Sequence, residues 1–288
     1  MKNNYYQSSN DFSLAGLFLM FATMAVGGTV LAIPYLFLVR IIPMIILNII
    51  VACIYGGVLG FIASKICQKF KIRNVTVVIF GIILGTLIFT YFKWIFFVSY
   101  VFDGNYFSLL GNLVFNPPLL WDSIRTINHE GTFTLGKSDV TRTAVTGVAL
   151  WVVWIVEFAI IGGFPLFMAV SSAKKPFIES ENDWAKSQDN PAIRFVDFDI
   201  KSELPMTVEN PHLLAEKEIC RKLSTKDNYI FAQIWVSSDY SENYVQLFYQ
   251  KYDHKSKRWD NKKASKLFGI DNAVYNEIME RYNSTSAE

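Results

Sequence analysis

The chain has 288 residues, of which 52% are apolar and 16% are aromatic, and its formal net charge is +2. Its basic residues are unevenly spread, since only ten of the 27 precede Ser171. A soluble core rarely needs uninterrupted apolar runs of about 20 residues, whereas a bilayer core about 30 Å thick requires them. The composition of the first half therefore excludes an ordinary soluble protein.

Four apolar stretches are predicted to span a membrane. The first carries no charge between Asp11 and Arg40, and it is too long for the apolar core of a signal peptide, which has about 7–15 residues. The predicted spans cover residues 12–39, 41–63, 75–101 and 145–170. Each is long enough to cross a bilayer with some tilt. We therefore expect an all-α transmembrane four-helix bundle over residues 1–170.

Flanking charges give the bundle a direction. The short connection between spans two and three holds four basic residues: Lys65, Lys69, Lys71 and Arg73. By the positive-inside rule this connection lies in the cytoplasm. Lys174 and Lys175, directly after the fourth span, agree with this direction. We expect a protein of the cell (inner) membrane with cytoplasmic N- and C-termini and an external segment at residues 102–144.

The external segment is too long for a plain turn and alternates apolar and polar groups. Short amphipathic helices that lie in the membrane interface would account for this pattern. A re-entrant element that covers the bundle is the alternative, since irregular backbone is tolerated at depth only where protein or water shields it.

Pairs of glycines mark spans two and three. Gly56 and Gly60 form one GxxxG pair, and Gly81 and Gly85 form another. Such surfaces let helix backbones approach closely, so we expect spans two and three to touch there or to mediate self-association. The simpler explanation is that glycine is frequent in membrane helices.

Two charges fall well inside predicted spans, Lys93 in the third and Glu157 in the fourth. A central acidic residue costs about 2.5–3.5 kcal/mol, so Glu157 should face the bundle, be paired or be protonated. The flexible stem of Lys93 can reach toward it. We favour a structural pair that fixes the packing of spans three and four. A proton or cation relay is the functional alternative, although transporters usually show more than one such pair and internal repeats.

The C-terminal third predicts a small soluble α+β domain over residues 193–288, after a linker at 171–192. Residues 229–236 and 244–252 alternate in hydrophobicity around a turn, which indicates a β-hairpin. One further strand and two helices are expected: a strand at 193–200 and helices at 212–223 and 271–282.

One segment of this domain is strongly basic, because residues 251–266 hold seven basic and two acidic residues, a net charge of +5. Its candidates for contact with a lipid surface are Lys255, Lys257, Arg258, Trp259, Lys262 and Lys263. Anionic lipids of the cytoplasmic leaflet attract such segments, and Trp259 would insert at the interface. A solvated loop is the simpler explanation, and no nucleic acid is expected because no RNP-type motif is present.

Metal and cofactor sites are not predicted. The three cysteines form no CxxC pair, and the three histidines have no ligand spacing: Cys53, Cys67, Cys220, His129, His212 and His254. We assign no metal and no cofactor.

Two short segments carry a resemblance. They are residues 154–157, with sequence WIVE, and residues 176–184, with sequence PFIESENDW. Together they resemble uncharacterised bacterial multipass membrane proteins, which implies no activity. In those proteins a cysteine pair follows the Pro-Phe, whereas this chain has Ile178 and Glu181 at the corresponding places. The resemblance therefore implies no metal-binding role for this segment.

Catalytic motifs are missing as well, since the sequence holds no GxSxG, P-loop, GxGxxG or HExxH pattern. We expect a non-enzymatic membrane protein that anchors, scaffolds or signals through its cytoplasmic domain. Its expected partners are the lipid bilayer and a protein partner or a second copy of the chain. A transporter or channel for a small solute or ion, using Lys93 and Glu157, is the alternative.

Overall fold

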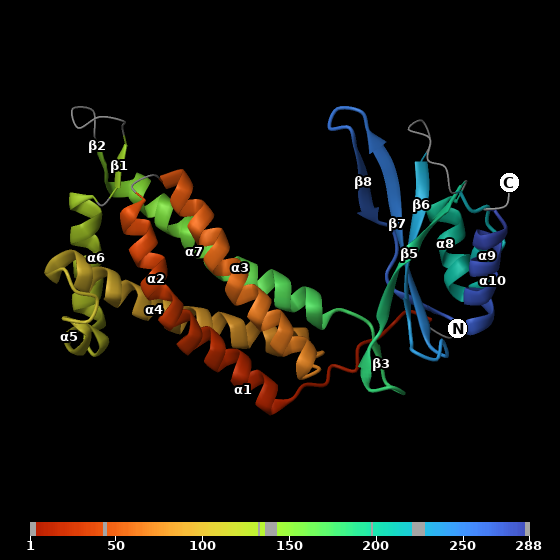
Figure 1. Ribbon diagram of the computed structural model, residues 1–288, viewed down its shortest axis with the longest axis horizontal. Helices are drawn as coiled ribbons and strands as arrows, with labels where there is room; N and C mark the ends of the chain where they lie inside the picture. The colour runs from red at the N-terminus through yellow and green to blue at the C-terminus, as the bar shows by residue number, and fades with distance from the viewer. Residues whose placement is uncertain are drawn as a thin grey trace. The chain divides into compact units, whose positions relative to one another are not determined.

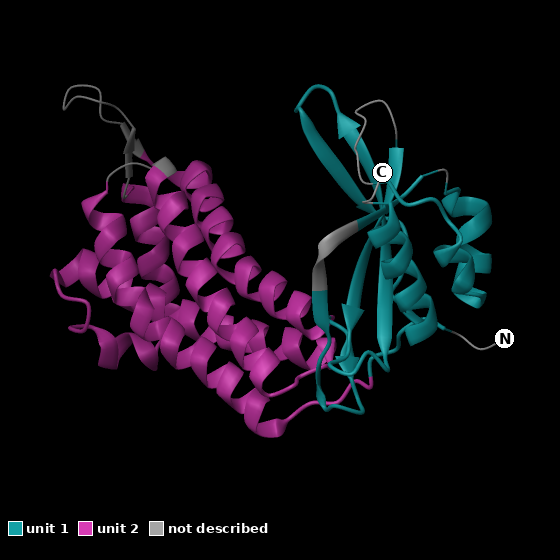
Figure 2. Ribbon diagram, turned by 45° about the vertical axis from the view of Figure 1, so that its right-hand side comes forward, with its two compact units in different colours: residues 1–8, 175–288 teal, residues 9–174 magenta. Residues whose placement is uncertain are grey.

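The computed structural model describes residues 4–42, 45–131, 133–135, 143–196, 198–220 and 228–285. The chain divides into two compact units (Figure 2). Residues Ser9–Lys174 form the membrane unit, and residues Met1–Ser8 together with Lys175–Glu288 form the soluble unit. The N-terminal tail thus belongs to the same unit as the C-terminal domain.

Among the described residues, four helical segments are long and apolar enough to cross a membrane: Leu14–Ile41, Leu47–Lys69, Val75–Asp103 and Gly147–Ala173. The first comprises α1 (Leu14–Ala22), the π-helical segment η1 (Thr23–Gly27) and α2 (Gly28–Ile41). The others belong to α3 (Ile45–Lys69), α4 (Val75–Asp103) and α7 (Gly147–Ala173) (Figure 1). The predicted four-span bundle is confirmed, and the chain is a multipass membrane protein.

Local signals begin and end these helices. The Ser13 side chain accepts a hydrogen bond from the Gly16 N–H at the start of α1, and the Asn74 side chain accepts one from the Val77 N–H at the start of α4. Gly104 follows α4 with a φ of 69°, a left-handed conformation that favours glycine.

Small residues do allow close helix packing, but between other spans than we predicted. A Cβ atom at Gly60 of α3 would lie 3.0 Å from the Phe164 carbonyl oxygen of α7. A Cβ atom at Gly85 of α4 would lie 2.5 Å from the Met24 Cβ of η1. The prediction that spans two and three touch at their glycines is therefore wrong, because span two packs on span four and span three on span one. Self-association through spans two and three stays a prediction, but these glycines no longer support it, since helices of the same chain cover them.

The segment between α4 and α7 forms two short helices, α5 (Leu110–Val114) and α6 (Pro117–Glu130), and a hairpin of β1 (Phe133–Leu135) and β2 (Thr143–Val145). Short helices were predicted here. One face of α6 is buried against α4 and α7 by three apolar side chains: Leu120, Ile124 and Ile127. Part of the predicted external segment, residues 136–142, lies outside the described residues.

The soluble unit is built on a five-stranded antiparallel sheet of order β5-β6-β7-β8, in which β9 also pairs with β7. The strands are β5 (Lys186–Phe195), β6 (Asn228–Val236), β7 (Asn243–Asp253), β8 (Arg258–Lys263) and β9 (Phe268–Ile270). The predicted β6–β7 hairpin is present, with Val236 opposite Asn243. Alternate residues of β6 and β7 face a core that also contains Phe195 and Phe268. The small α+β domain predicted from the sequence is confirmed.

Three helices lie on one side of this sheet (Figure 1). They are α8 (Ile200–Glu209), α9 (His212–Ala215) and α10 (Asn272–Ser284). The N-terminal tail extends the sheet beyond β9, because Tyr5 forms an antiparallel bridge with Phe268. The Tyr6 N–H donates to the Leu267 carbonyl at 2.9 Å, and the Asn4 side chain donates to the Val208 carbonyl of α8 at 2.8 Å.

Span two begins at Leu47 and ends at Lys69, six residues later than predicted at each end. Three boundaries in the linker and the soluble unit also differ from the sequence predictions. The expected linker at 171–192 instead holds the end of α7, the hairpin of β3 (Phe177–Ile178) and β4 (Asp183–Trp184), and the start of β5. The expected strand at 193–200 ends at Phe195, because Asp199 caps α8 by accepting from the Lys201 N–H. The expected helix at 212–223 ends at Ala215, and Ile219 pairs with Phe195 instead. Residues 221–223 lie outside the described residues.

Candidate functional site

The two charges predicted inside the spans meet in the structure. Lys93 lies on α4 and Glu157 on α7, and the Lys93 Nζ donates to the Glu157 Oε1 at 2.5 Å. The Lys93 side chain is 8% exposed and that of Glu157 is 16% exposed. Each charge therefore has its counter-charge in direct contact, which is what a buried ion needs in a medium of low dielectric constant.

A small cavity borders this ion pair. Its volume is about 20 Å³, which is room for about one water molecule. Apart from the two charges its walls are apolar or aromatic: Tyr35, Leu36, Val39, Trp94, Phe97 and Trp154. Lys93 Nζ lies 5.3 Å from the centre of the Trp94 ring and 5.8 Å from that of Tyr35, within the range of cation–π attraction.

A stack of tyrosines connects the ion pair to span one. The ring of Tyr35 on α2 stacks on that of Tyr55 on α3, with centroids 5.0 Å apart. The Tyr55 hydroxyl donates to the Gly28 carbonyl at 2.6 Å, directly after the π-helical segment η1. Since π-helical turns interrupt the regular backbone ladder, this bond satisfies a carbonyl group at an irregular place. Tyr35 and Glu157 line the same cavity, and the buried Tyr35 hydroxyl has no hydrogen-bond partner of ordinary geometry among the described residues.

Other buried polar side chains of the spans lie away from this cavity. Asn48, Thr86 and Ser99 have side-chain atoms without a hydrogen-bond partner among the described residues. None of the three lines the cavity beside Lys93 and Glu157. These three side chains therefore do not extend the ion pair into a longer polar path.

The residues predicted to contact lipid belong to the hairpin of β7 and β8. Four of them, Lys255, Lys257, Lys262 and Lys263, are exposed, as is Arg258. Trp259 is different, because its ring packs 5.3 Å from that of Tyr252 and 5.8 Å from that of Tyr229. This packing does not support the predicted insertion of Trp259 into a bilayer.

An open groove of about 790 Å³ lies between α6 and α7, and the sequence did not point to it. Its lining combines aromatic, basic and amide side chains with a threonine and a glycine: Trp121, Arg125, Asn128, His129, Thr146, Gly147 and Trp151. The Asn128 side chain donates to the Gly147 carbonyl at 2.9 Å and so joins the two helices. Trp121, Arg125 and His129 are spaced four residues apart along α6, which places them on one face of the helix. This spacing is the feature of the sequence that could have indicated the groove.

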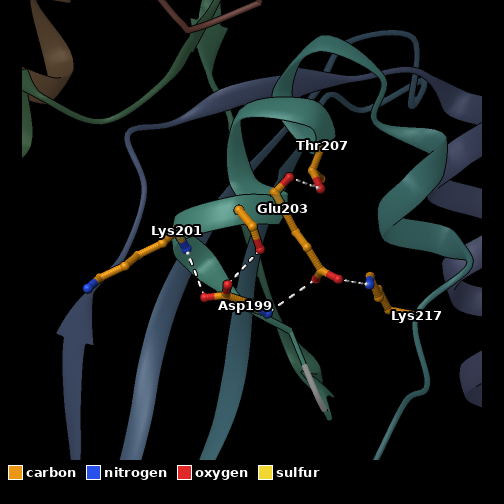
Figure 3. A network of polar contacts seen from close by, with 6 residues as sticks. Asp199, Lys201, Glu203, Thr207 and Lys217 are labelled. Atoms are coloured by element: carbon orange, nitrogen blue, oxygen red, sulfur yellow. Dashed lines mark hydrogen bonds and ion pairs between the residues drawn. The ribbon is translucent and has the colours of Figure 1, made fainter.

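The soluble unit holds a compact polar network around the start of α8 (Figure 3). The Glu203 carboxylate accepts from Lys217 at 2.7 Å and from the Asp199 N–H at 3.2 Å. Hydrogen bonds from the Ser202 hydroxyl and the Lys201 N–H hold the pKa of the Asp199 carboxyl below its usual range. These contacts cap the helix and tie it to the chain after α9, so we assign the network a structural role.

Neither a metal site nor a similarity to known proteins provides further evidence on function. The described residues contain no group of three His, Cys, Asp or Glu side chains that could hold a metal ion. The segment that carries the resemblance forms the β3–β4 hairpin, where Phe177 packs edge-on against Trp184 at 5.3 Å. Comparison with known protein families, with curated proteins and with solved structures found no match.

Proposed function

We propose that this protein is a membrane anchor that holds its soluble unit at the cytoplasmic face of the cell membrane, as a scaffold or signalling platform, and that it is not an enzyme. In this proposal the ion pair of Lys93 and Glu157 fixes α4 against α7. The observation that carries it is the direct contact of the two charges beside a cavity with room for only about one water molecule.

The pairing of the N-terminal tail supports the placement of both ends of the chain on the same side of the membrane. Tyr5 pairs with β9 of the soluble unit, while α1 begins a few residues later at Leu14. Four spans return the chain to the side on which it started. The basic connection between α3 and α4 supports the cytoplasm as that side, although Arg73 is engaged by Asp11 rather than free.

A transporter or channel for a small solute or ion is the second candidate. One observation favours it: the Tyr35 hydroxyl is buried at the cavity that Glu157 also lines, without a hydrogen bond of ordinary geometry among the described residues. A hydroxyl, a carboxylate and space for about one water molecule are the elements from which a proton relay is built.

A double-mutant cycle separates the two functions. The variants are Lys93→Met, Glu157→Gln and the pair of both, with Lys65→Met at the exposed end of α3 as the matched control. Each single change leaves one buried group without its partner, so we expect a loss of up to about 3 kcal/mol in the free energy of unfolding in detergent. The double variant should lose less than the sum of the two singles, and Lys65→Met should change little.

The unmodified protein and the four variants are then reconstituted into liposomes that contain a pH-sensitive or a potassium-sensitive dye. An anchor predicts proton and potassium fluxes equal to those of empty liposomes for every variant. Flux through the unmodified protein that is lost in Glu157→Gln, together with additive effects on stability, would favour the transporter instead.

A further inference from the structure

The strongest charge on the soluble unit is concentrated on one protruding hairpin. β7 and β8 pair from Phe248 opposite Lys263 to Asp253 opposite Arg258, and residues 254–257 form the turn between them (Figure 1). All seven basic residues of positions 251–266 are exposed. The segment has a net charge of +5, whereas the chain as a whole has a net charge of +2.

The two acidic residues of the hairpin are engaged locally. Asp253 accepts a hydrogen bond from the Lys255 N–H at 3.0 Å and so closes the turn. Hydrogen bonds from Ser256 and from the Lys255 N–H hold the pKa of the Asp253 carboxyl below its usual range, so it stays ionised in this role. Asp260 lies 3.7 Å from the Lys262 ammonium. Within the part of the chain that the structure describes, no acidic side chain forms an ion pair with Lys255 or Lys257 at the tip, and both lysines are exposed.

The backbone of the turn adds a second observation. Lys257 has a φ of 53°, in the left-handed region that glycine and asparagine favour. A lysine is a poor choice for such a position if the turn needs only to close. The same conformation occurs at Lys71, so the chain tolerates a lysine there, and at Lys257 the lysine adds a cation to the tip of the hairpin.

The partner follows from where the unit is attached. The last span, α7, ends at Ala173, and the soluble unit begins at Lys175, so the soluble unit is tethered directly to the membrane. A tethered surface acts at high effective concentration, and anionic lipids attract exposed basic clusters within a Debye length of about 10 Å. We propose that the tip of the β7–β8 hairpin is a contact surface for anionic lipid headgroups, which holds the soluble unit against its own membrane.

The proposed contact differs from the one expected from the sequence, in which Trp259 inserts into the membrane interface. Because the Trp259 ring packs against those of Tyr229 and Tyr252, it is engaged within the sheet, and the groups that the hairpin tip offers are cations. The contact is therefore electrostatic, and salt should weaken it strongly. It does not depend on the role of Lys93 and Glu157, and it requires only that the soluble unit is tethered to a bilayer.

The test uses the full chain in nanodiscs of phosphatidylcholine alone or of phosphatidylcholine mixed with phosphatidylglycerol. A water-soluble amine-reactive reagent labels the lysines, and mass spectrometry gives the labelling rate at each site. We expect the rates at Lys255 and Lys257 to fall on the order of threefold in the anionic nanodiscs at low salt and to recover at high salt. Lys201 should be labelled equally in both, since its side chain extends away from its neighbours (Figure 3) and lies outside the hairpin.

A matched pair of variants distinguishes charge from folding. Lys255→Ser with Lys257→Gly removes two tip charges, and the glycine suits the positive φ, so the turn should be retained. Lys186→Ser with Lys201→Ser removes two exposed charges elsewhere in the unit. We expect the first variant, and not the second, to lose the lipid-dependent protection of Lys262 and Lys263.

Three results would overturn the proposal. The first is equal labelling of the tip in both kinds of nanodisc. The second is equal loss of protection in the two double variants. The third is protection of the tip by a single-stranded oligonucleotide but not by anionic lipid, which would assign the hairpin to nucleic acid instead.

Discussion

Arg73 shows how far the meaning of a single charge depends on its contacts. In the sequence it is one of four basic residues that orient the bundle. In the structure it is 8% exposed, its Nη2 donates to the Asp11 carboxylate at 2.9 Å, and its backbone N–H donates to the Asp11 carbonyl. It joins the start of span one to the start of span three. The sequence could not reveal this pair, because nothing local links two residues that far apart in the chain.

The ion pair of Lys93 and Glu157 was easier to predict. Each residue is conspicuous because charge is expensive inside a bilayer, and only two such residues lie well inside the spans. Their contact was expected and is present at 2.5 Å. The tyrosine stack beside them was not predicted, because aromatic residues are common in these helices and their spacing does not say which ones face inward.

Asp239, in the turn between β6 and β7, gives a prediction about acid. Hydrogen bonds from the Ser241 N–H and from the hydroxyls of Ser241 and Ser237 lower its pKa from 3.8 to about 2. A carboxyl group whose pKa is lower in the folded protein than in the unfolded chain stabilises the fold at pH values above its ordinary pKa of 3.8. This stabilisation is lost as the pH falls through the folded pKa of about 2. The difference in melting temperature between the unmodified protein and Asp239→Asn should be constant above about pH 5 and shrink between about pH 4 and pH 2. A difference that is independent of pH would contradict this.

At the scale of elements, the apolar helices were predictable and their partners were not. Length and hydropathy located all four spans, because the bilayer sets both quantities. Three of them agree with the prediction to within three residues at each end, whereas span two begins and ends six residues later than predicted. The GxxxG pairs correctly indicated close helix packing. A glycine pair does not specify, however, which of the other helices packs against it. The π-helical segment η1 also escaped prediction, since residues 23–27 are as apolar as the helix around them.

In the soluble unit, hydrophobic alternation predicted β6 and β7 almost to the residue. The sequence did not predict α8, because Pro205 lies in its interior and proline disfavours the interior of a helix. It also failed at β8, where five of the six residues are exposed and charge obscures the strand pattern. That strand is held by its pairing with β7, which no local pattern announces.

The contact of α3 with α7 leads to a prediction with an internal control. Gly60→Leu places side-chain atoms where the Phe164 carbonyl lies 3.0 Å from the glycine's would-be Cβ. We expect a loss of about 1–3 kcal/mol in the free energy of unfolding in detergent, as for other overpacked sites. Gly57→Leu is the control, because nothing lies within 4 Å of its would-be Cβ. Equal melting temperatures for the two variants would show that this face of α3 is not packed as described.

At the scale of the whole molecule, the two ends of the chain belong to one folded unit. Asn4, Tyr5 and Tyr6 bond to β9 and α8, and the Tyr6 ring packs 5.1 Å from that of Tyr244. The order of domains was predictable from composition, since a membrane half precedes a polar one. The pairing of the tail was not, because residues 4–6 precede every span and carry no strand pattern of their own.

A direct measurement tests whether the chain anchors one unit on one side of the membrane. In a background without Cys53, Cys67 and Cys220, single cysteines are placed at exposed positions in the tail, the soluble unit and α6: Gln7→Cys, Lys266→Cys and Asp122→Cys. Each is treated with a membrane-impermeant thiol reagent in intact cells and in inverted membrane vesicles. We predict that Asp122→Cys is labelled only in intact cells, and that Gln7→Cys and Lys266→Cys are labelled only in inverted vesicles. Labelling of positions 7 and 266 from opposite sides, or of all three positions from the same side, would contradict the account.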